Sequence, residues 1–168
     1  MTQFSARTIS ASTVPVPSDQ IWEILTDPDS LAELTPLIRS IEASGSRWLW
    51  TLNGIEALGM RVEAAFTESM EFTDERQIVF THDPPQGKKE HAAVEGIYDL
   101  TPAGPNSTDL RVDLTLSVEL PLPRMARPAV ERVILATMRA TGRQFASNLY
   151  QRLELDPKTA EINELSLP

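Results

Sequence analysis

The change of hydrophobic period along this chain constrains its fold more than any other feature. From residue 37 to residue 120, apolar residues recur at every second position in several segments. The clearest run is Leu110, Val112, Leu114, Leu116, Val118 and Leu120. After Pro121 and Pro123 the period becomes 3.6, and an apolar stripe continues to about Leu153. The alternation predicts an antiparallel sheet with one apolar face, and the stripe predicts one long helix that covers this face.

The segments that precede the sheet predict a strand and two short helices. Residues 4–14 are rich in Ser, Thr and β-branched residues and are followed by two prolines, which favours a strand that ends there. Ser18 can then cap a first helix. Asp27 followed by Pro28 is a start signal for a second helix, because a carboxylate at the N-cap and a proline at the first helical position both suit a helix start.

The order of these elements predicts an α+β fold. Turn residues divide the alternating region into about six further strands, which makes an antiparallel sheet of about seven strands. The long C-terminal helix, over Pro128 to Leu153, would span about 39 Å. A curved sheet wrapped around a helix leaves a gap lined by both, and a ligand would bind there. We expect a single domain over residues 1–155 and an acidic, flexible tail over residues 156–168.

Composition and charge exclude several functional classes. The chain has 168 residues, a net charge of −9 and no cysteine, so disulfides, thiolate metal sites and cysteine nucleophiles are excluded. The acidic balance opposes binding to nucleic acid. The first twelve residues do not form a secretory signal, and no apolar stretch approaches the length of a membrane span. We expect a cytoplasmic protein.

No motif for metal, cofactor or nucleophilic chemistry is present in the sequence. His82 and His91 lie nine residues apart, and no acidic cluster completes a set of metal ligands, so we interpret them as solvated histidines of a hairpin. The sequence also lacks a nucleophile elbow, a phosphate-binding glycine loop and a dinucleotide fingerprint. We therefore assign no metal ligand, no cofactor and no catalytic residue.

Polar residues at inward positions are more informative. Alternation through Phe66 and Met70 places Glu68 on the apolar face, unless a β-bulge or the sheet rim turns it outward. Tyr98 also alternates inward, either as a core residue or toward a ligand. On the long helix, the Thr141 hydroxyl faces the same space or bonds back to the helix.

A basic ridge, formed by Arg132, Arg139 and Arg143, lies opposite the apolar stripe of the long helix. Such a ridge is either a solvated outer face or the contact for an anionic protein partner or a peripheral membrane surface.

Residues 14–36 resemble the opening of the START-like helix-grip superfamily, also called SRPBCC. In that superfamily a first strand ends in a proline-bearing turn, a helix carries a pair such as Ile21 and Trp22, and Asp-Pro, here Asp27 and Pro28, leads into a second short helix. The sequence is most similar to the polyketide cyclase/dehydratase-like branch and to the accessory subunits of carbon monoxide dehydrogenase. The resemblance implies a helix-grip fold and covers nearly the whole chain in the order of elements.

The leading functional hypothesis is the binding or transport of a hydrophobic small molecule, such as a lipid, a quinone or a polyketide, between sheet and long helix. The ligand-binding residues would be Trp50, Phe66, Glu68, Phe80, Tyr98, Leu114, Leu116, Met138, Thr141 and Phe145. One alternative is a cyclase or dehydratase whose pocket supplies one general acid or base. Another is an accessory protein that uses the basic ridge to recruit a partner enzyme to a membrane. Whether the protein is an enzyme stays open at this stage.

Overall fold

The computed structural model describes residues 1–57, 59–62 and 64–168, and it has the predicted α+β architecture of a curved antiparallel sheet with one long helix. The strands are β1 (Thr2–Val14), β2 (Ile38–Ser44), β3 (Arg47–Leu52), β4 (Ile55–Ala57), β5 (Met60–Val62), β6 (Ala65–Thr73), β7 (Gln77–His82), β8 (Ala92–Pro102), β9 (Thr108–Leu120) and β10 (Asn163–Glu164). The helices are α1 (Ser18–Leu25), α2 (Pro28–Leu34), η1 (Arg124–Ala126), α3 (Arg127–Arg152) and η2 (Pro157–Thr159). No helix in the described part of the chain is long and apolar enough to cross a membrane.

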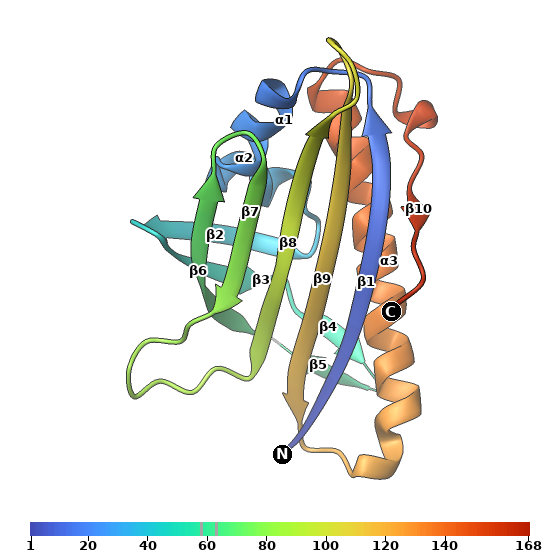
Figure 1. Cartoon of the computed structure of the whole chain (residues 1–168). Coiled ribbons are helices and arrows are strands. Elements are labelled where there is room, and N and C mark those ends of the chain that lie inside the picture. The colour runs from blue at the N-terminus through green and yellow to red at the C-terminus, as the bar shows by residue number, and fades with distance from the viewer. Residues whose placement is uncertain (58, 63) are drawn as a thin grey trace.

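Eight strands form the main sheet, in the order β10, β1, β9, β8, β7, β6, β3, β2. All of its pairings are antiparallel, as the short connections predicted. Figure 1 shows β2 and β3 running crosswise to β8 and β9, so that the sheet curves around the space in front of α3. The strands β4 and β5 form a separate hairpin. The sheet therefore exceeds the expected seven strands by one, and the additional strand comes from the C-terminal tail.

The two short helices begin for different local reasons. In α2, the Asp27 carboxylate accepts a hydrogen bond from the backbone N–H of Ser30 at 3.0 Å, and Pro28 occupies the first helical position, as predicted. The prediction for α1 was wrong by one residue. Its N-cap is Pro17, whose side chain makes no capping bond, and Ser18 is already the first helical residue.

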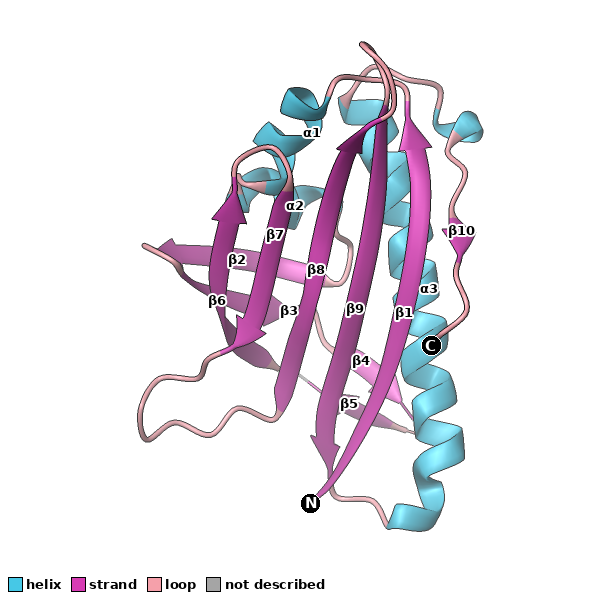
Figure 2. Ribbon diagram, viewed as in Figure 1, coloured by secondary structure: helices cyan, strands magenta, loops and turns pink. Residues whose placement is uncertain are grey.

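The long helix α3 is tied to β1 near both of its ends. Near its N-terminus, the Glu131 carboxylate accepts a hydrogen bond from the backbone N–H of Ser5 at 3.2 Å. Near its C-terminus, the Tyr150 hydroxyl donates to the carbonyl oxygen of Thr13 at 3.3 Å. Figure 2 shows the helix running along the sheet between these ends. Contacts near its two ends therefore hold the middle of α3 over the inner face of the sheet.

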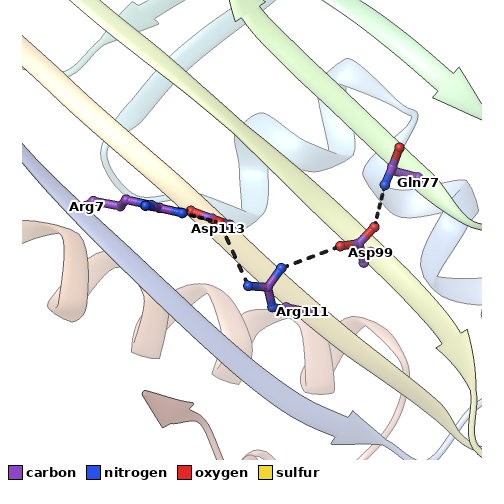
Figure 3. Close-up of polar contacts among 5 residues, drawn as sticks. All are labelled: Arg7, Gln77, Asp99, Arg111 and Asp113. Atoms are coloured by element: carbon purple, nitrogen blue, oxygen red, sulfur yellow. Dashed lines mark hydrogen bonds and ion pairs between the residues drawn. The ribbon is translucent and has the colours of Figure 1, made fainter. Parts of the chain in front are cut away.

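The outer face of the sheet carries a polar network across four strands, drawn in Figure 3. Arg7 of β1 donates two hydrogen bonds of 2.9 Å to the Asp113 carboxylate of β9. Arg111 lies between Asp113 and Asp99, and Gln77 of β7 donates to Asp99 at 2.7 Å. Because this face carries charged side chains, it is exposed to solvent. The apolar residues at the alternate positions of the same strands consequently face α3.

Part of the C-terminal tail is attached to the sheet, where we expected a frayed end. Asn163 and Glu164 pair with β1, and the backbone N–H of Leu165 donates to the carbonyl oxygen of Ile9 at 2.8 Å. The Glu164 carboxylate also accepts hydrogen bonds from the Arg139 guanidinium of α3, with an Nε to Oε2 distance of 2.9 Å. The tail therefore bridges β1 and α3.

Candidate ligand-binding cavity

A cavity of about 300 Å³ lies between the middle of α3 and the inner face of the sheet. All ten residues predicted as ligand-binding line it. From the sheet these are Trp50 of β3, Phe66 and Glu68 of β6, Phe80 of β7, Tyr98 of β8, and Leu114 and Leu116 of β9. From α3 they are Met138, Thr141 and Phe145. The structure thus brings together residues from six elements around one space; their binding of a ligand stays a prediction.

The sequence patterns missed two further parts of the cavity wall. The first is a row of hydroxyl side chains on β1, Thr8, Ser10 and Ser12, whose spacing of two was a signal of one shared face. The second is part of the tail, Ala160, Glu161, Ile162 and Glu164, which lines the cavity together with Arg139. No periodic pattern marks such a short segment, so its position was not predictable from the sequence.

Two glycines contribute to the shape of the cavity. A Cβ atom added to Gly142 of α3 would meet no atom within 4 Å beyond the adjacent residues and backbone of its own helix, so the helix leaves open space at this point. In β8, a Cβ at Gly96 would overlap the carbonyl oxygen of Asp113 and lie 2.9 Å from the Phe80 ring. The absence of a side chain at Gly96 therefore lets Phe80 reach across the sheet to its place in the cavity wall.

The Glu68 side chain points to the inner face of the sheet, because β6 pairs with β3 and β7 without a bulge at this position. It pairs with Trp48 of β3 and with His82 of β7. Its side chain is 1% exposed, and in the described part of the chain its Oε2 atom has no hydrogen-bond partner. Burial, and then the negative charge of Glu95, raise the pKa of Glu68 to about 9. Glu68 is therefore a neutral carboxylic acid at pH 7.

Two aromatic pairs line the same cavity as this carboxyl group. Trp50 stacks on Phe66 with ring centroids 6.0 Å apart, and Tyr98 lies 5.1 Å from the Phe80 ring. The Trp50 Nε1 atom is buried and, like Oε2 of Glu68, has no partner among the residues described. Burial, and then the nearby Glu68, raise the pKa of the Tyr98 hydroxyl, so it stays protonated. Around Glu68 the sheet side of the wall is therefore mostly apolar, whereas the charged lining residues come from α3 and the tail.

The basic ridge of Arg132, Arg139 and Arg143 is exposed to solvent, as its spacing predicted. Arg139 is engaged by Glu164 of the tail, and this ion pair raises the pKa of Arg139 and lowers that of Glu164. Arg139 and Arg143 also line the cavity, which the sequence pattern did not indicate. Contact of the ridge with an anionic partner or a membrane surface stays a prediction.

Both histidines contact glutamate carboxylates. His82 lies 2.9 Å from the Glu90 carboxylate, which also accepts hydrogen bonds from the backbone N–H and the hydroxyl of Thr67. His91 lies 3.1 Å from Glu119. The interpretation of His82 as a solvated histidine is wrong, because its side chain is only 21% exposed. Neither histidine lines the cavity.

Comparisons with known proteins agree with this architecture. The family model described as polyketide cyclase/dehydrase and lipid transport matches residues 6–154. A search of curated proteins found no significant match.

Three solved structures share the fold. A conserved protein from Geobacillus kaustophilus is 15% identical with a TM-score of 0.68, over 94% of this chain and 99% of that chain. A START superfamily protein from Mycobacterium smegmatis is 22% identical with a TM-score of 0.62, over 89% of this chain and 98% of that chain. The Zhui aromatase/cyclase from a Streptomyces species is 13% identical with a TM-score of 0.66, over 89% of this chain and 94% of that chain. These likenesses confirm the predicted helix-grip fold.

Proposed function

Because the chain belongs to the polyketide cyclase/dehydrase and lipid transport family, we propose that it binds and transports a hydrophobic small molecule, such as a lipid, a quinone or a polyketide, between the sheet and α3. The observation that carries the proposal is the cavity of about 300 Å³, with aromatic and aliphatic walls from both layers. Protein interiors are normally close-packed, and a void forfeits the contacts of the atoms around it. A ligand with an apolar surface would restore those contacts.

The dimensions of the cavity favour a compact ligand. Small-molecule sites commonly span about 300–1,000 Å³, so this cavity belongs to the small end of the range. A molecule of two or three rings, or a short acyl chain, suits that volume better than a long lipid. The scarcity of charged groups on the sheet side of the wall favours ligands that are uncharged over most of their surface.

A direct titration tests this proposal. Trp50 lines the cavity, and its fluorescence is expected to change when quinones, short-chain lipids or aromatic polyketide fragments are added to the protein. The matched pair Gly142→Ala and Gly142→Leu separates cavity binding from surface binding. The alanine variant is expected to bind as the native protein does, and the leucine variant is expected to lose most of its affinity. Titrations that stay flat across the whole panel would contradict the proposal.

A second function, as a cyclase or dehydratase, is favoured by one observation: a buried carboxyl group with a pKa of about 9 in the cavity wall. Such a group could protonate or deprotonate a bound poly-carbonyl chain, a contribution typically worth about 10² to 10⁴ in rate. Glu68→Gln would then abolish turnover of a poly-carbonyl substrate and weaken its binding only modestly. Equal turnover by the native protein and this variant would exclude Glu68 as the acid or base.

A further inference from the structure

Two buried polar atoms on one wall of the cavity have no partner among the residues that the structure describes. They are Oε2 of Glu68 and Nε1 of Trp50. Their side chains are 1% and 7% exposed, and both line the cavity. Buried polar groups in proteins are nearly always hydrogen-bonded, because an unsatisfied one loses its bonds to water without gaining others. Two such atoms on the same wall therefore require an explanation.

The register of the sheet places these two side chains close to each other. Trp50 of β3 pairs with Phe66 of β6, and Trp48 pairs with Glu68. Trp50 and Glu68 are therefore diagonal neighbours on the same inward face of two adjacent strands. Diagonal neighbours lie within reach of each other's long or aromatic side chains. A single ligand that occupies the cavity can meet both.

The chemistry of the pair selects a ligand that accepts hydrogen bonds. An indole N–H only donates, and a neutral carboxylic acid donates through its O–H. Glu68 is neutral at pH 7, because burial and Glu95 raise its pKa to about 9. An anionic ligand group is disfavoured at this wall, since it would be buried against Glu68 without a cation. The arginines of the cavity, Arg139 and Arg143, come from α3, and Arg139 is already paired with Glu164.

We propose that Glu68 and Trp50 form a polar subsite that binds an uncharged carbonyl oxygen, as found in a ketone, an ester or a quinone. The apolar remainder of the ligand would fill the rest of the cavity. This inference rests on the proposed function and sharpens it, because it selects carbonyl compounds from among the hydrophobic molecules and disfavours free carboxylates and hydrocarbons.

Calorimetric titration with three probes of one shape tests the subsite. The probes are 2-acetylnaphthalene, which is a ketone, 2-ethylnaphthalene, which lacks the oxygen, and 2-naphthoate, which is charged. At pH 7 the ketone is expected to bind the native protein about tenfold more tightly than the hydrocarbon, since only the ketone satisfies the buried donors. The naphthoate is expected to bind more weakly than the ketone.

Variants of the two residues identify the source of the preference. Glu68→Leu combined with Trp50→Phe removes both donors and keeps apolar bulk, so the ketone should lose about tenfold in affinity and the hydrocarbon should not. Glu68→Gln alone is the control, because its amide still donates and should keep most of the preference. Near-ultraviolet circular dichroism of each variant verifies the native fold.

Three outcomes would overturn the inference in distinguishable ways. Equal affinity of ketone and hydrocarbon for the native protein means that the two atoms are satisfied in another way, for example by a resident water, and leaves the proposed function standing. A preference that survives in the double variant means that another group binds the oxygen. Failure of all three probes to bind would contradict the proposed function together with this inference.

Discussion

Glu68 illustrates how a single register position determines the chemistry of the cavity. The strand β6 pairs continuously with β3 and β7, so alternation carries Glu68 to the same inward face as Phe66 and Met70. A shift of one residue would place Thr67 inward and Glu68 in water. Glu68 is therefore neutral because strand register places it in apolar surroundings, and not because of a specific hydrogen bond.

The raised pKa of Glu68 predicts a particular dependence of stability on pH. The unfolded chain releases this proton near pH 4.5, and the native protein holds it until about pH 9. Between these values the native state binds one more proton than the unfolded state, so stability decreases as the pH rises. The contribution of the protonated Glu68 side chain to stability is therefore complete below about pH 4.5 and is lost as the pH passes 9.

Denaturant unfolding of the native protein and of Glu68→Gln, measured from pH 5 to pH 9, checks this prediction. The free energy of unfolding of the native protein is expected to fall relative to that of the variant over this range. The titratable groups that act on Glu68 or pair beside it, namely Glu95, Tyr98 and His82, are present in both proteins and largely cancel in the difference. A difference that does not change with pH would show that Glu68 is ionised in the native state.

At the scale of elements, α3 has to be stable as a helix and also has to leave space for the cavity, and these two requirements favour different residues. Helix stability favours alanine over glycine by about 1 kcal/mol in a helix interior, and yet Gly142 stands in the middle of α3 beside the cavity. The lack of a side chain there keeps the space open, because no atom beyond the adjacent part of α3 itself lies within 4 Å of a Cβ at this position.

Substitutions at Gly142 are therefore expected to separate stability from binding. Gly142→Ala should raise the free energy of unfolding by about 1 kcal/mol, because it increases helix propensity without meeting another atom. Gly142→Leu should keep some of this gain and reduce ligand affinity. Chemical unfolding and ligand titration of both variants provide the two measurements. A loss of stability in the alanine variant would indicate that the backbone at this position is strained.

The attachment of β10 depends on a very short strand pairing and one exposed ion pair. Loss of the Arg139 to Glu164 contact in Arg139→Gln is expected to loosen the tail locally, with little effect on the rest of the fold. The amide of Leu165, which donates to Ile9, should then exchange its hydrogen faster. Arg143→Gln is the matched control, since no partner of Arg143 is found in the described residues. Equal exchange rates in the two variants would contradict the prediction.

At the scale of the whole molecule, periodic features were predictable and non-periodic ones were not. The long helix differs from its predicted bounds by one residue at each end, and the ten predicted lining residues surround one cavity, because both rest on repeating apolar positions. The two-residue strand β10 has no periodic signal. Alternation placed the Trp50 ring inward but contained no information on whether its N–H has a partner.

The presence of a void also could not be derived from the pattern. Alternation shows which faces of the sheet and helix meet, whereas the space between them depends on the summed volumes of many side chains and on the distance at which α3 is held. That distance is set by contacts near the two ends of the helix, such as those of Ser5 with Glu131 and of Thr13 with Tyr150. These contacts join residues more than 120 positions apart in the sequence.

The stability of the whole molecule should respond to filling of this void. A ligand that binds only the native state raises the free energy of unfolding by RT ln(1 + [L]/Kd), which is about 2.7 kcal/mol at a concentration of one hundred times Kd. For a domain of this length, that corresponds to an increase in Tm of about 5–10 °C. Differential scanning calorimetry with 2-acetylnaphthalene should show this increase in the native protein and in Gly142→Ala. The Gly142→Leu variant should show little increase, because its side chain competes for the same space. An equal increase in all three proteins would mean that the probe stabilises the fold from a site outside the cavity.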